Sequence, residues 1–255
     1  MLRQSPLSPA RMYELAYYFK RPPDNRFLRF LTALVIQHAP GRRLLDCACG
    51  TGEPALHLAT EFSLTLADAS PAMLRLAKRK AAAMGILNLR FHTARWVDLA
   101  EAVGGSFDAV ICCGNAISQS LRPTDLRAAL AGMSSVLITG GLVYVDFHET
   151  DSRADSRAGF VPVDVSGPIY WGRRQLLFVI CERQARGILY RQKLCYSIEG
   201  TKLRLAGSAL TIYRPINRKA LRDHLLTIGF HSVRFVKRPG RWPMTAVIAR
   251  KGTTT

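Results

Sequence analysis

The residues best placed for chemistry lie in residues 44–52, which read Leu-Leu-Asp-Cys-Ala-Cys-Gly-Thr-Gly. The two leucines are typical of a buried parallel strand, and Asp46 follows near its carboxyl end. Gly50 and Gly52 then let the backbone approach a ligand closely, because glycine has no Cβ. Residues 54–59 predict a helix after this turn. Open α/β sheets bind ligands in the crevice beyond such a strand end, so the stretch predicts a ligand site.

A second acid, Asp68, ends the next expected strand, residues 63–68. A carboxylate at that place can accept two hydrogen bonds from the hydroxyl pair of a ribose. The G-x-G-x-x-G dinucleotide fingerprint would have its third glycine at Ala55, where alanine is tolerated. The spacing of the glycines therefore leaves a dinucleotide open as the ligand.

These segments resemble the class I S-adenosylmethionine-dependent methyltransferases through residues 45–52 and 68–74. Residues 94–96, 107–115 and 140–146 are most similar to the glycine N-methyltransferase group. The resemblance implies an α/β, Rossmann-like fold with a mostly parallel seven-stranded sheet and helices on both faces. It also implies a small antiparallel β insertion near the active site. The expected cofactor is S-adenosyl-L-methionine, and the expected reaction is methyl transfer to an amine nitrogen of a small polar or anionic molecule.

The resemblance also implies which residues bind the cofactor. They are Asp46, Ala48, Cys49, Gly50, Gly52, Asp68, Ala69, Met73, Arg95, Trp96, Cys113, Gly114 and Asn115. The indole of Trp96 would lie against the adenine, since it offers a flat apolar surface to a purine. A group near Arg95 would meet the amino edge of that base. A tryptophan packed in the core is the alternative for Trp96.

Four side chains are candidates for the catalytic centre, namely Asn115, Asp146, His148 and Tyr13. In the relatives a neutral asparagine lies beside the sulfonium and the acceptor amine, and Asn115 matches it. Asp146, His148 and the N-terminal tyrosines are the nearest candidates for a general base, which methyl transfer to a neutral amine does not require.

His148 departs from the glycine N-methyltransferase pattern, which has an arginine at this place. A neutral imidazole cannot make the two-pronged contact that arginine makes with a carboxylate, so the departure argues against glycine as the acceptor. Tyr13, together with Tyr17 and Tyr18, is a candidate for a lid over the cofactor, with ordinary packing as the alternative.

Apolar periodicity and turn residues predict the elements that position these groups. Helices are expected over residues 10–19, 25–38, 71–84, 123–137 and 218–228, and core strands over 63–68, 87–91, 107–113, 142–147, 232–237 and 245–249. A loop over 150–167 would lead to three antiparallel strands over 175–183, 188–198 and 203–214. The expected divisions are a helical lid (1–40), a cofactor-binding core (41–149), an antiparallel cover over the acceptor (150–214) and a final helix with two strands (215–255).

Positive charge is concentrated in the second half of the chain. The formal net charge is +18, and residues 151–255 hold 20 Lys and Arg against 6 Asp and Glu, which gives +14. This distribution suggests an anionic substrate, a nucleic acid or an acidic membrane surface, with a solvated basic face as the alternative.

Composition bears on the cellular compartment in which we expect the protein. No apolar run is long enough to cross a membrane, and the N-terminus lacks an apolar signal core. The 6 cysteines form no C-x-x-C pair, so we expect buried thiols in a reducing, cytoplasmic compartment and no metal site. The sequence leaves open whether the protein forms a homo-oligomer.

Three other functions compete with small-molecule N-methylation. The basic region favours an RNA methyltransferase, although the D/N-P-P-Y/F motif is absent and residues 114–117 read Gly-Asn-Ala-Ile. O- or C-methylation of a small aromatic or quinone-like metabolite is open as well. The binding motifs are also compatible with a non-catalytic protein that only binds the cofactor.

Overall fold

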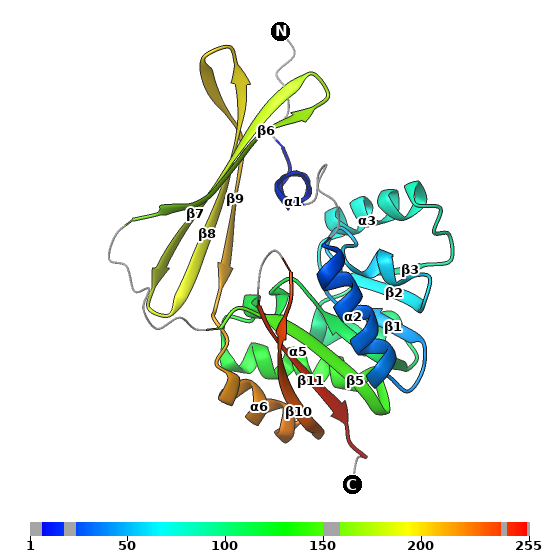
Figure 1. Cartoon of the computed structure of the whole chain (residues 1–255). Coiled ribbons are helices and arrows are strands. Elements are labelled where there is room, and N and C mark those ends of the chain that lie inside the picture. Colours follow the sequence, from blue (N-terminus) through cyan, green and yellow to red (C-terminus); the bar gives the residue numbers. More distant parts are fainter. Residues whose placement is uncertain (1–6, 18–23, 150–158, 241–243, 254–255) are drawn as a thin grey trace. The chain divides into compact units, whose positions relative to one another are not determined.

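The computed structural model describes residues 7–17, 24–149, 159–240 and 244–253 (Figure 1). The chain divides into two compact units, and each unit is built from two separate stretches. Unit 1 joins Met1–Pro22 to Asp151–Arg214, and unit 2 joins Pro23–Thr150 to Pro215–Thr255. The N-terminal segment expected over residues 1–40 is therefore divided, because its two helices belong to different units.

Unit 2 contains a seven-stranded sheet with the order β10-β11-β5-β4-β1-β2-β3. The strands are β1 (Arg43–Asp46), β2 (Ser63–Asp68), β3 (Arg90–Thr93), β4 (Phe107–Cys112), β5 (Leu137–Phe147), β10 (Phe230–Arg238) and β11 (Met244–Lys251). The first five run parallel, and β11 pairs antiparallel with both β5 and β10. This is the predicted mostly parallel sheet. The strand order reverses between β1 and β4, which is where such sheets bind ligands.

Helices cover both faces of this sheet. They are α2 (Asn25–His38), α3 (Pro71–Ala83), α4 (Leu99–Val103), α5 (Pro123–Ser135) and α6 (Arg218–Thr227), with the 3-10 helices η1 (Ala55–Leu58), η2 (Trp96–Asp98) and η3 (Ala116–Gln119). Two predicted helix starts are confirmed by their caps. Asp24 accepts the first amides of α2, and Asn217 accepts the amide of Ala220 in α6.

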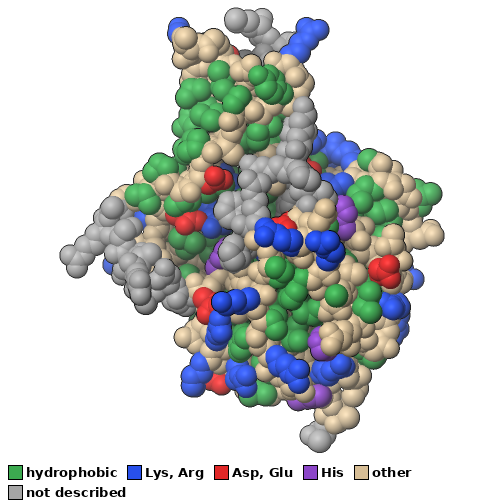
Figure 2. Space-filling model, in the orientation of Figure 1, with side chains coloured by type: hydrophobic (Ala, Val, Ile, Leu, Met, Phe, Trp, Pro, Cys, Tyr) green, Lys and Arg blue, Asp and Glu red, His purple; other side chains and the backbone are tan. Residues whose placement is uncertain are grey.

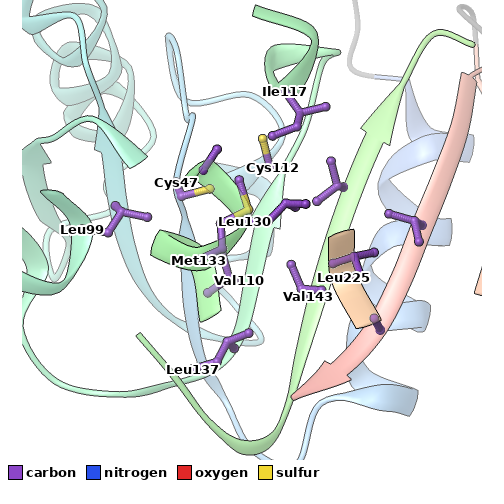
Figure 3. Close-up of a cluster of buried hydrophobic side chains, with 14 of the residues drawn as sticks. Cys47, Leu99, Val110, Cys112, Ile117, Leu130, Met133, Leu137, Val143 and Leu225 are labelled. Atoms are coloured by element: carbon purple, nitrogen blue, oxygen red, sulfur yellow. The ribbon is translucent and has the colours of Figure 1, made fainter. Parts of the chain in front are cut away.

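The core follows from the alternation of side chains along buried strands. Neighbouring β1 residues Leu44 and Leu45 are both fully buried but belong to different hydrophobic clusters, one on each face of the sheet. Figure 3 shows one of these clusters, in which Val110 and Val143 from the strands pack among helical side chains such as Leu130. The strands that lead to the candidate site are thereby packed on both faces.

Three expectations within unit 2 are wrong. The helix expected over 54–59 is a single 3-10 turn, because the Leu58 carbonyl is taken by the amides of Glu61 and Phe62 and β2 begins directly after. The third strand begins at Arg90 instead of residue 87, and Leu87 is 83% exposed. The fifth strand begins at residue 137, so the glycines at 140–141 lie within β5 and do not end α5.

The described residues of unit 1 form a four-stranded antiparallel sheet and one helix. The strands are β6 (Val161–Trp171), β7 (Arg174–Ala185), β8 (Ile188–Glu199) and β9 (Lys202–Tyr213), and the helix is α1 (Pro9–Tyr17). Met12 and Leu15 of α1 pack in one cluster with Leu176, Phe178 and Cys195 of the sheet. The helix thus forms a small core with this sheet.

The sequence pattern does not predict the fourth strand of unit 1. A loop is expected over 150–167, but β6 begins at Val161 and pairs with β7. Its prolines, Pro162 and Pro168, hide the strand pattern, yet they are tolerated because β6 is an edge strand. Tyr18 and Phe19 of the expected first helix lie outside the described residues. None of the described helices is long and apolar enough to cross a membrane.

Candidate functional site

The glycine turn after β1 is held by hydrogen bonds to neighbouring strand ends. The Gly50 amide donates to the Asp68 carboxylate at 2.8 Å, and the Cys49 amide donates to the Ala67 carbonyl at 3.0 Å. Gly52 has φ +99° and its missing Cβ would lie 2.7 Å from a methyl carbon of Leu56. Gly50 has φ +54° and faces open space, with nothing within 4 Å of that position. One glycine therefore permits packing, and the other leaves room for a ligand.

Asp68 occupies the end of β2 as predicted. Its second carboxylate oxygen accepts the Ser70 amide at 2.8 Å, so the side chain ties the glycine turn to the start of α3. Burial raises the pKa of this carboxyl, and the two backbone hydrogen bonds oppose that rise. Each carboxylate oxygen has a further lone pair, so the half-buried group can still accept from a ligand.

Asp46 is fully buried at the end of β1. One oxygen accepts the Ala48 amide at 3.1 Å, while the other has no hydrogen-bond partner among the described residues. The hydroxyl of Thr51, in the glycine turn, also has none within that part of the chain. Burial, together with the charges of Asp68 and Asp146, raises the pKa of Asp46 to about 8, although the hydrogen bond from Ala48 opposes the rise. A cation at this edge of the sheet would reverse that shift.

A second tight turn follows β4. Gly114 and Asn115 both have left-handed backbones, with φ of 73° and 63°. Asparagine tolerates this conformation better than most side chains. Asp146, at the end of β5, accepts the Asn115 amide at 3.0 Å and also bonds the Gly114 amide. The carboxylate therefore fixes the shape of this turn.

Arg238 lies at the candidate site, and the sequence did not reveal its place there. Its Nε lies 3.1 Å from the Asp146 carboxylate, and its guanidinium lies 3.6 Å from the centroid of the Phe27 ring. Burial raises the pKa of Asp146, while the charge of Arg238 lowers it. Asp146 is fully buried. We expect it to position its neighbours and not to exchange protons with a substrate.

The side-chain oxygen of Asn115 accepts hydrogen bonds from the Ser118 hydroxyl at 2.6 Å and from the His148 amide at 2.9 Å. Both of its lone pairs are used, so this oxygen connects the turn after β4 to the chain after β5. His148 is also joined to the chain through its carbonyl, which accepts the Ile216 amide at 3.3 Å. The expected position of Asn115 beside the reacting groups stays a prediction.

The residues expected near an adenine occupy η2 and the turn before it. The Arg95 guanidinium is exposed and pairs with Asp98 at 2.7 Å, which lowers the pKa of that carboxyl. Trp96 is half-buried against the core, so part of its ring stays accessible. The Arg95 side chain thus pairs with Asp98 at the surface, where such an ion pair is weak and leaves other donors of the guanidinium accessible.

The remaining expected cofactor residues lie around the same edge. Ala69 is exposed and Met73 is half-buried at the start of α3, while Cys49 and Cys113 are buried. Burial raises the pKa of both thiols well above the usual range. Both thiols are therefore poor nucleophiles, and their expected part in cofactor binding stays a prediction.

Tyr13 belongs to unit 1, where its ring lies 4.9 Å from that of Tyr17. The ammonium of Lys193, on β8, lies 5.3 Å from the centroid of each ring. Lys193 is only 4% exposed, and burial lowers its pKa to about 8. The roles predicted for Tyr13 and for the other site residues stay predictions.

Comparison with known proteins finds a family match over the glycine turn and its neighbours. Residues 44–141 match the methyltransferase domain family. The chain is 34% identical over 160 residues to the glycine N-methyltransferase of Oryctolagus cuniculus, covering 56% of this chain and 52% of that protein. It is 31% identical over 139 residues to a dTDP-3-amino-3,6-dideoxy-alpha-D-glucopyranose N,N-dimethyltransferase of Streptomyces fradiae, covering 54% and 52%. The chain thus spans about half the length of the curated relatives that it matches.

A solved structure extends the likeness of fold to most of the chain. The sugar N-methyltransferase of a Streptoalloteichus species has a TM-score of 0.76 and 22% identity, and the match covers 94% of this chain and 92% of that one. Residues 44–141, which hold the glycine turn and Asp68, therefore match the methyltransferase domain family, and the chain has the Rossmann-like fold of the methyltransferase structure that it resembles.

Proposed function

We propose that the protein is an S-adenosylmethionine-dependent methyltransferase that methylates an amine nitrogen of a small polar or anionic molecule. One observation carries the proposal. In a chain with net charge +18, the carboxyl ends of β1, β2 and β5 gather three carboxylates, Asp46, Asp68 and Asp146, close enough to influence one another. Asp146 is paired with Arg238, so a sulfonium cation would meet Asp68 and Asp46 there, and it would favour the ionised form of the Asp46 carboxyl.

The residues present fit this cofactor. The space beside Gly50 admits a ligand against the backbone, and Asp68 has the lone pairs to accept from a ribose. The oxygens of Asp46 and Thr51 that lack a partner among the described residues offer polar contacts to the charged methionyl end. The accessible part of Trp96 suits a purine. When bound, the cofactor supplies a methyl group that is already activated for transfer.

The protein's own contribution is alignment. An amine must present its lone pair in line with the S–CH₃ bond, and a fixed geometry accelerates such a displacement. Asp146 and Asn115 hold the turn after β4 and the chain at His148 in one arrangement. A neutral amine loses its proton after transfer, so no base is needed for bond formation.

The acceptor we favour is an amine other than glycine. His148 stands where the glycine-specific pattern has arginine, and the structural match that covers most of the chain is named a sugar N-methyltransferase. The relative from Streptomyces fradiae is named for an amino sugar linked to a nucleoside diphosphate. The +14 charge of residues 151–255 suits an anionic acceptor of that kind.

The first experiment is a calorimetric titration of the protein with S-adenosylmethionine and, separately, with NADH. We expect binding of the first only. Gly50→Ala and Gly85→Ala form a matched pair, because both sites have positive φ and open space around the missing Cβ. Only Gly50→Ala should weaken cofactor binding, by about tenfold or more, which corresponds to about 1.4 kcal/mol. An equal loss of affinity for S-adenosylmethionine in both variants, or binding of NADH alone, would contradict the cofactor assignment.

Turnover is then measured as S-adenosylhomocysteine release with glycine, sarcosine, nucleotide-linked amino sugars, phenols and RNA. The proposal expects release with an amine only. Release with RNA or with phenols alone would replace N-methylation by one of the alternatives, while cofactor binding would still stand.

A further inference from the structure

A small basic pocket lies in unit 2, towards the end of the sheet opposite the candidate site. Arg250 of β11, which lines the pocket, pairs with Leu142 of β5. Asp146 of the candidate site pairs with Ala246, four residues earlier on β11. At about 3.4 Å per residue, the pocket is thus about 14 Å along the sheet from Asp146. Figure 2 shows Lys, Arg and His side chains gathered low in the view, where Figure 1 draws β10 and β11.

Two arginines of this pocket project from the face of the sheet that α2 covers. Ile248 of β11 packs in the hydrophobic cluster that contains the buried side chains of α2. Arg234 of β10 lies directly opposite Ile248, and Arg250 follows two residues later on β11. Directly opposite residues and residues two apart share a face of a sheet, so both guanidiniums lie on the α2 side. The helix ends at His38, which also lines the pocket.

A bulge in β10 forms one wall of the pocket. Three residues of β10, from His231 to Arg234, span only two residues of β11, from Arg250 back to Ile248. The extra residue falls at Ser232, which lines the pocket and has a left-handed backbone with φ 55°. Bulges re-aim side chains and occur preferentially beside functional sites. The bulge therefore adds a hydroxyl to the side of the pocket that holds the arginines.

The pocket is the size of a small polar group. Its volume is about 160 Å³, and its polar lining consists of the side chains of His38, Ser232, Arg234 and Arg250. Pockets that hold drug-sized molecules measure about 300–1,000 Å³. A ligand that enters this pocket is therefore a small molecule or one end of a larger one.

The pocket is electrically positive and its arginines have free donors. Burial lowers the pKa of His38, and the charges of Arg250 and Arg234 lower it further, with no carboxylate acting on this imidazole among the described residues. The Arg234 guanidinium makes no ion pair or hydrogen bond within the described part of the chain. Arg250 donates one N–H to the Gly140 carbonyl at 3.2 Å, which leaves most of its five donors for a ligand.

These four side chains match the chemistry of a phosphate group. Guanidinium forks bind phosphate oxygens in pairs, and a neutral imidazole and a hydroxyl each add one uncharged donor. The donors come from α2, β10 and β11, so they approach a ligand from several directions. A tetrahedral anion with three or four oxygens uses such an arrangement more fully than a planar carboxylate with two.

We propose that this pocket binds a phosphate group, either as inorganic phosphate or as the phosphate of a small phosphorylated metabolite. Arg234 and Arg250 hold the anion, while Ser232 and His38 complete its hydrogen bonds. The site is separate from the glycine turn and from Asp68, so it depends neither on the methyl acceptor nor on the cofactor.

The test follows the His38 imidazole by NMR while phosphate is added to the full chain at constant ionic strength, with chloride as the control ion. His38→Gln assigns the signal. We expect a saturable shift with a dissociation constant of about 1 mM or below. The pKa of His38 should rise on binding, because a bound dianion favours the imidazolium.

A matched pair of variants locates the site, with phosphate binding measured by calorimetry. Arg234→Gln should raise the dissociation constant at least about tenfold, because it removes a charged hydrogen-bond donor. Arg127→Gln replaces an exposed arginine of α5, which packs on the opposite face of the sheet, and should leave it unchanged. Arg250→Gln is a second variant, with an expected effect like that of Arg234→Gln. Circular dichroism verifies that each variant folds.

Ribose 5-phosphate and ribose distinguish the two sources of the phosphate group. Tighter binding of ribose 5-phosphate than of inorganic phosphate, with no binding of ribose, would favour a metabolite, and the reverse order would favour the free ion. An equal shift with chloride, no saturable shift with either phosphate, or unchanged affinity in both pocket variants would overturn the proposal. Binding of a short RNA without binding of phosphate would overturn it as well and would make this region an RNA-binding surface.

Discussion

Arg238 and Asp146 form a buried ion pair at the candidate site, with 3.1 Å between guanidinium nitrogen and carboxylate oxygen. The carboxylate also fixes the turn that contains Asn115, while the guanidinium lies against Phe27 of α2. The C-terminal strands therefore support the loop on which methyl transfer is proposed to occur.

Arg238→Met should destabilise unit 2 by about 3 kcal/mol, because it leaves the buried charge of Asp146 without its partner. The matched control is Arg218→Met, which breaks the exposed pair with Glu149 and should lose less than about 1 kcal/mol. Urea unfolding measures both. A similar loss of unfolding free energy in both variants would mean that the buried Arg238–Asp146 pair stabilises the protein no more than the exposed pair does.

Binding of S-adenosylmethionine at pH 7 should release up to about one proton. The Asp46 pKa is raised to about 8, so this carboxyl is mostly protonated before binding, and a nearby cation favours its ionised form. Cofactor affinity should therefore rise from pH 6 to pH 8 and level off above. Calorimetry in two buffers of different ionisation enthalpy measures the proton.

Asp46→Asn and S-adenosylhomocysteine are the controls for this proton release. The variant cannot ionise, and the product lacks the sulfonium charge, so both should show a smaller release. Equal proton release with the variant would assign the proton to another group.

Asp46 should also make stability depend on pH. Its pKa in the folded protein lies above the ordinary value of 3.8, so the folded state binds more protons between these values. Stability from this group is present at low pH and is lost as pH rises towards about 8. Asp46→Asn should flatten this slope in thermal unfolding measured from pH 5 to pH 8.

Lys193 should have the opposite effect on how the stability of the protein depends on pH. Its folded pKa of about 8 lies below its ordinary value of 10.5, so the unfolded chain binds more protons between them, and stability should rise with pH in this window. Lys193→Met should stabilise the protein at pH 7 more than at pH 9.5. Lys202→Met, at an exposed position of β9, is the control and should change neither value. An equal effect of Lys193→Met at both pH values would contradict the lowered pKa.

Asn115→Gly and Asn115→Ala separate two roles of one residue. Both remove the oxygen that accepts from Ser118 and His148, but only alanine is strained at φ 63°. The free energy of unfolding of Asn115→Ala should therefore be lower than that of Asn115→Gly by about 1 kcal/mol. Both should lower kcat and leave the Kd of the cofactor nearly unchanged. A Kd that changed as much as kcat would make Asn115 a cofactor-binding residue.

The sequence reveals local features of this protein better than distant ones. Asp24 and Pro40 mark α2 because a cap and a breaker act on adjacent residues. The pair Asp146–Arg238 is hidden in the sequence because it depends on how β10 and β11 fold back beside β5. β6 is hidden because its prolines are tolerated only at an edge, and edge position is a property of the whole sheet. The use of the Asn115 oxygen likewise depends on the approach of the chain after β5.

Unit 1 is assembled from the first residues of the chain and from a stretch that follows residue 150. During synthesis α1 therefore emerges long before the strands that bury Met12 and Leu15. Its apolar side stays uncovered until β9 has been synthesised. The same arrangement sets a rule for chimeras between this chain and its relatives. Exchanging residues 151–214 alone would place foreign strands against a native helix, so a transplant must include the N-terminal segment as well.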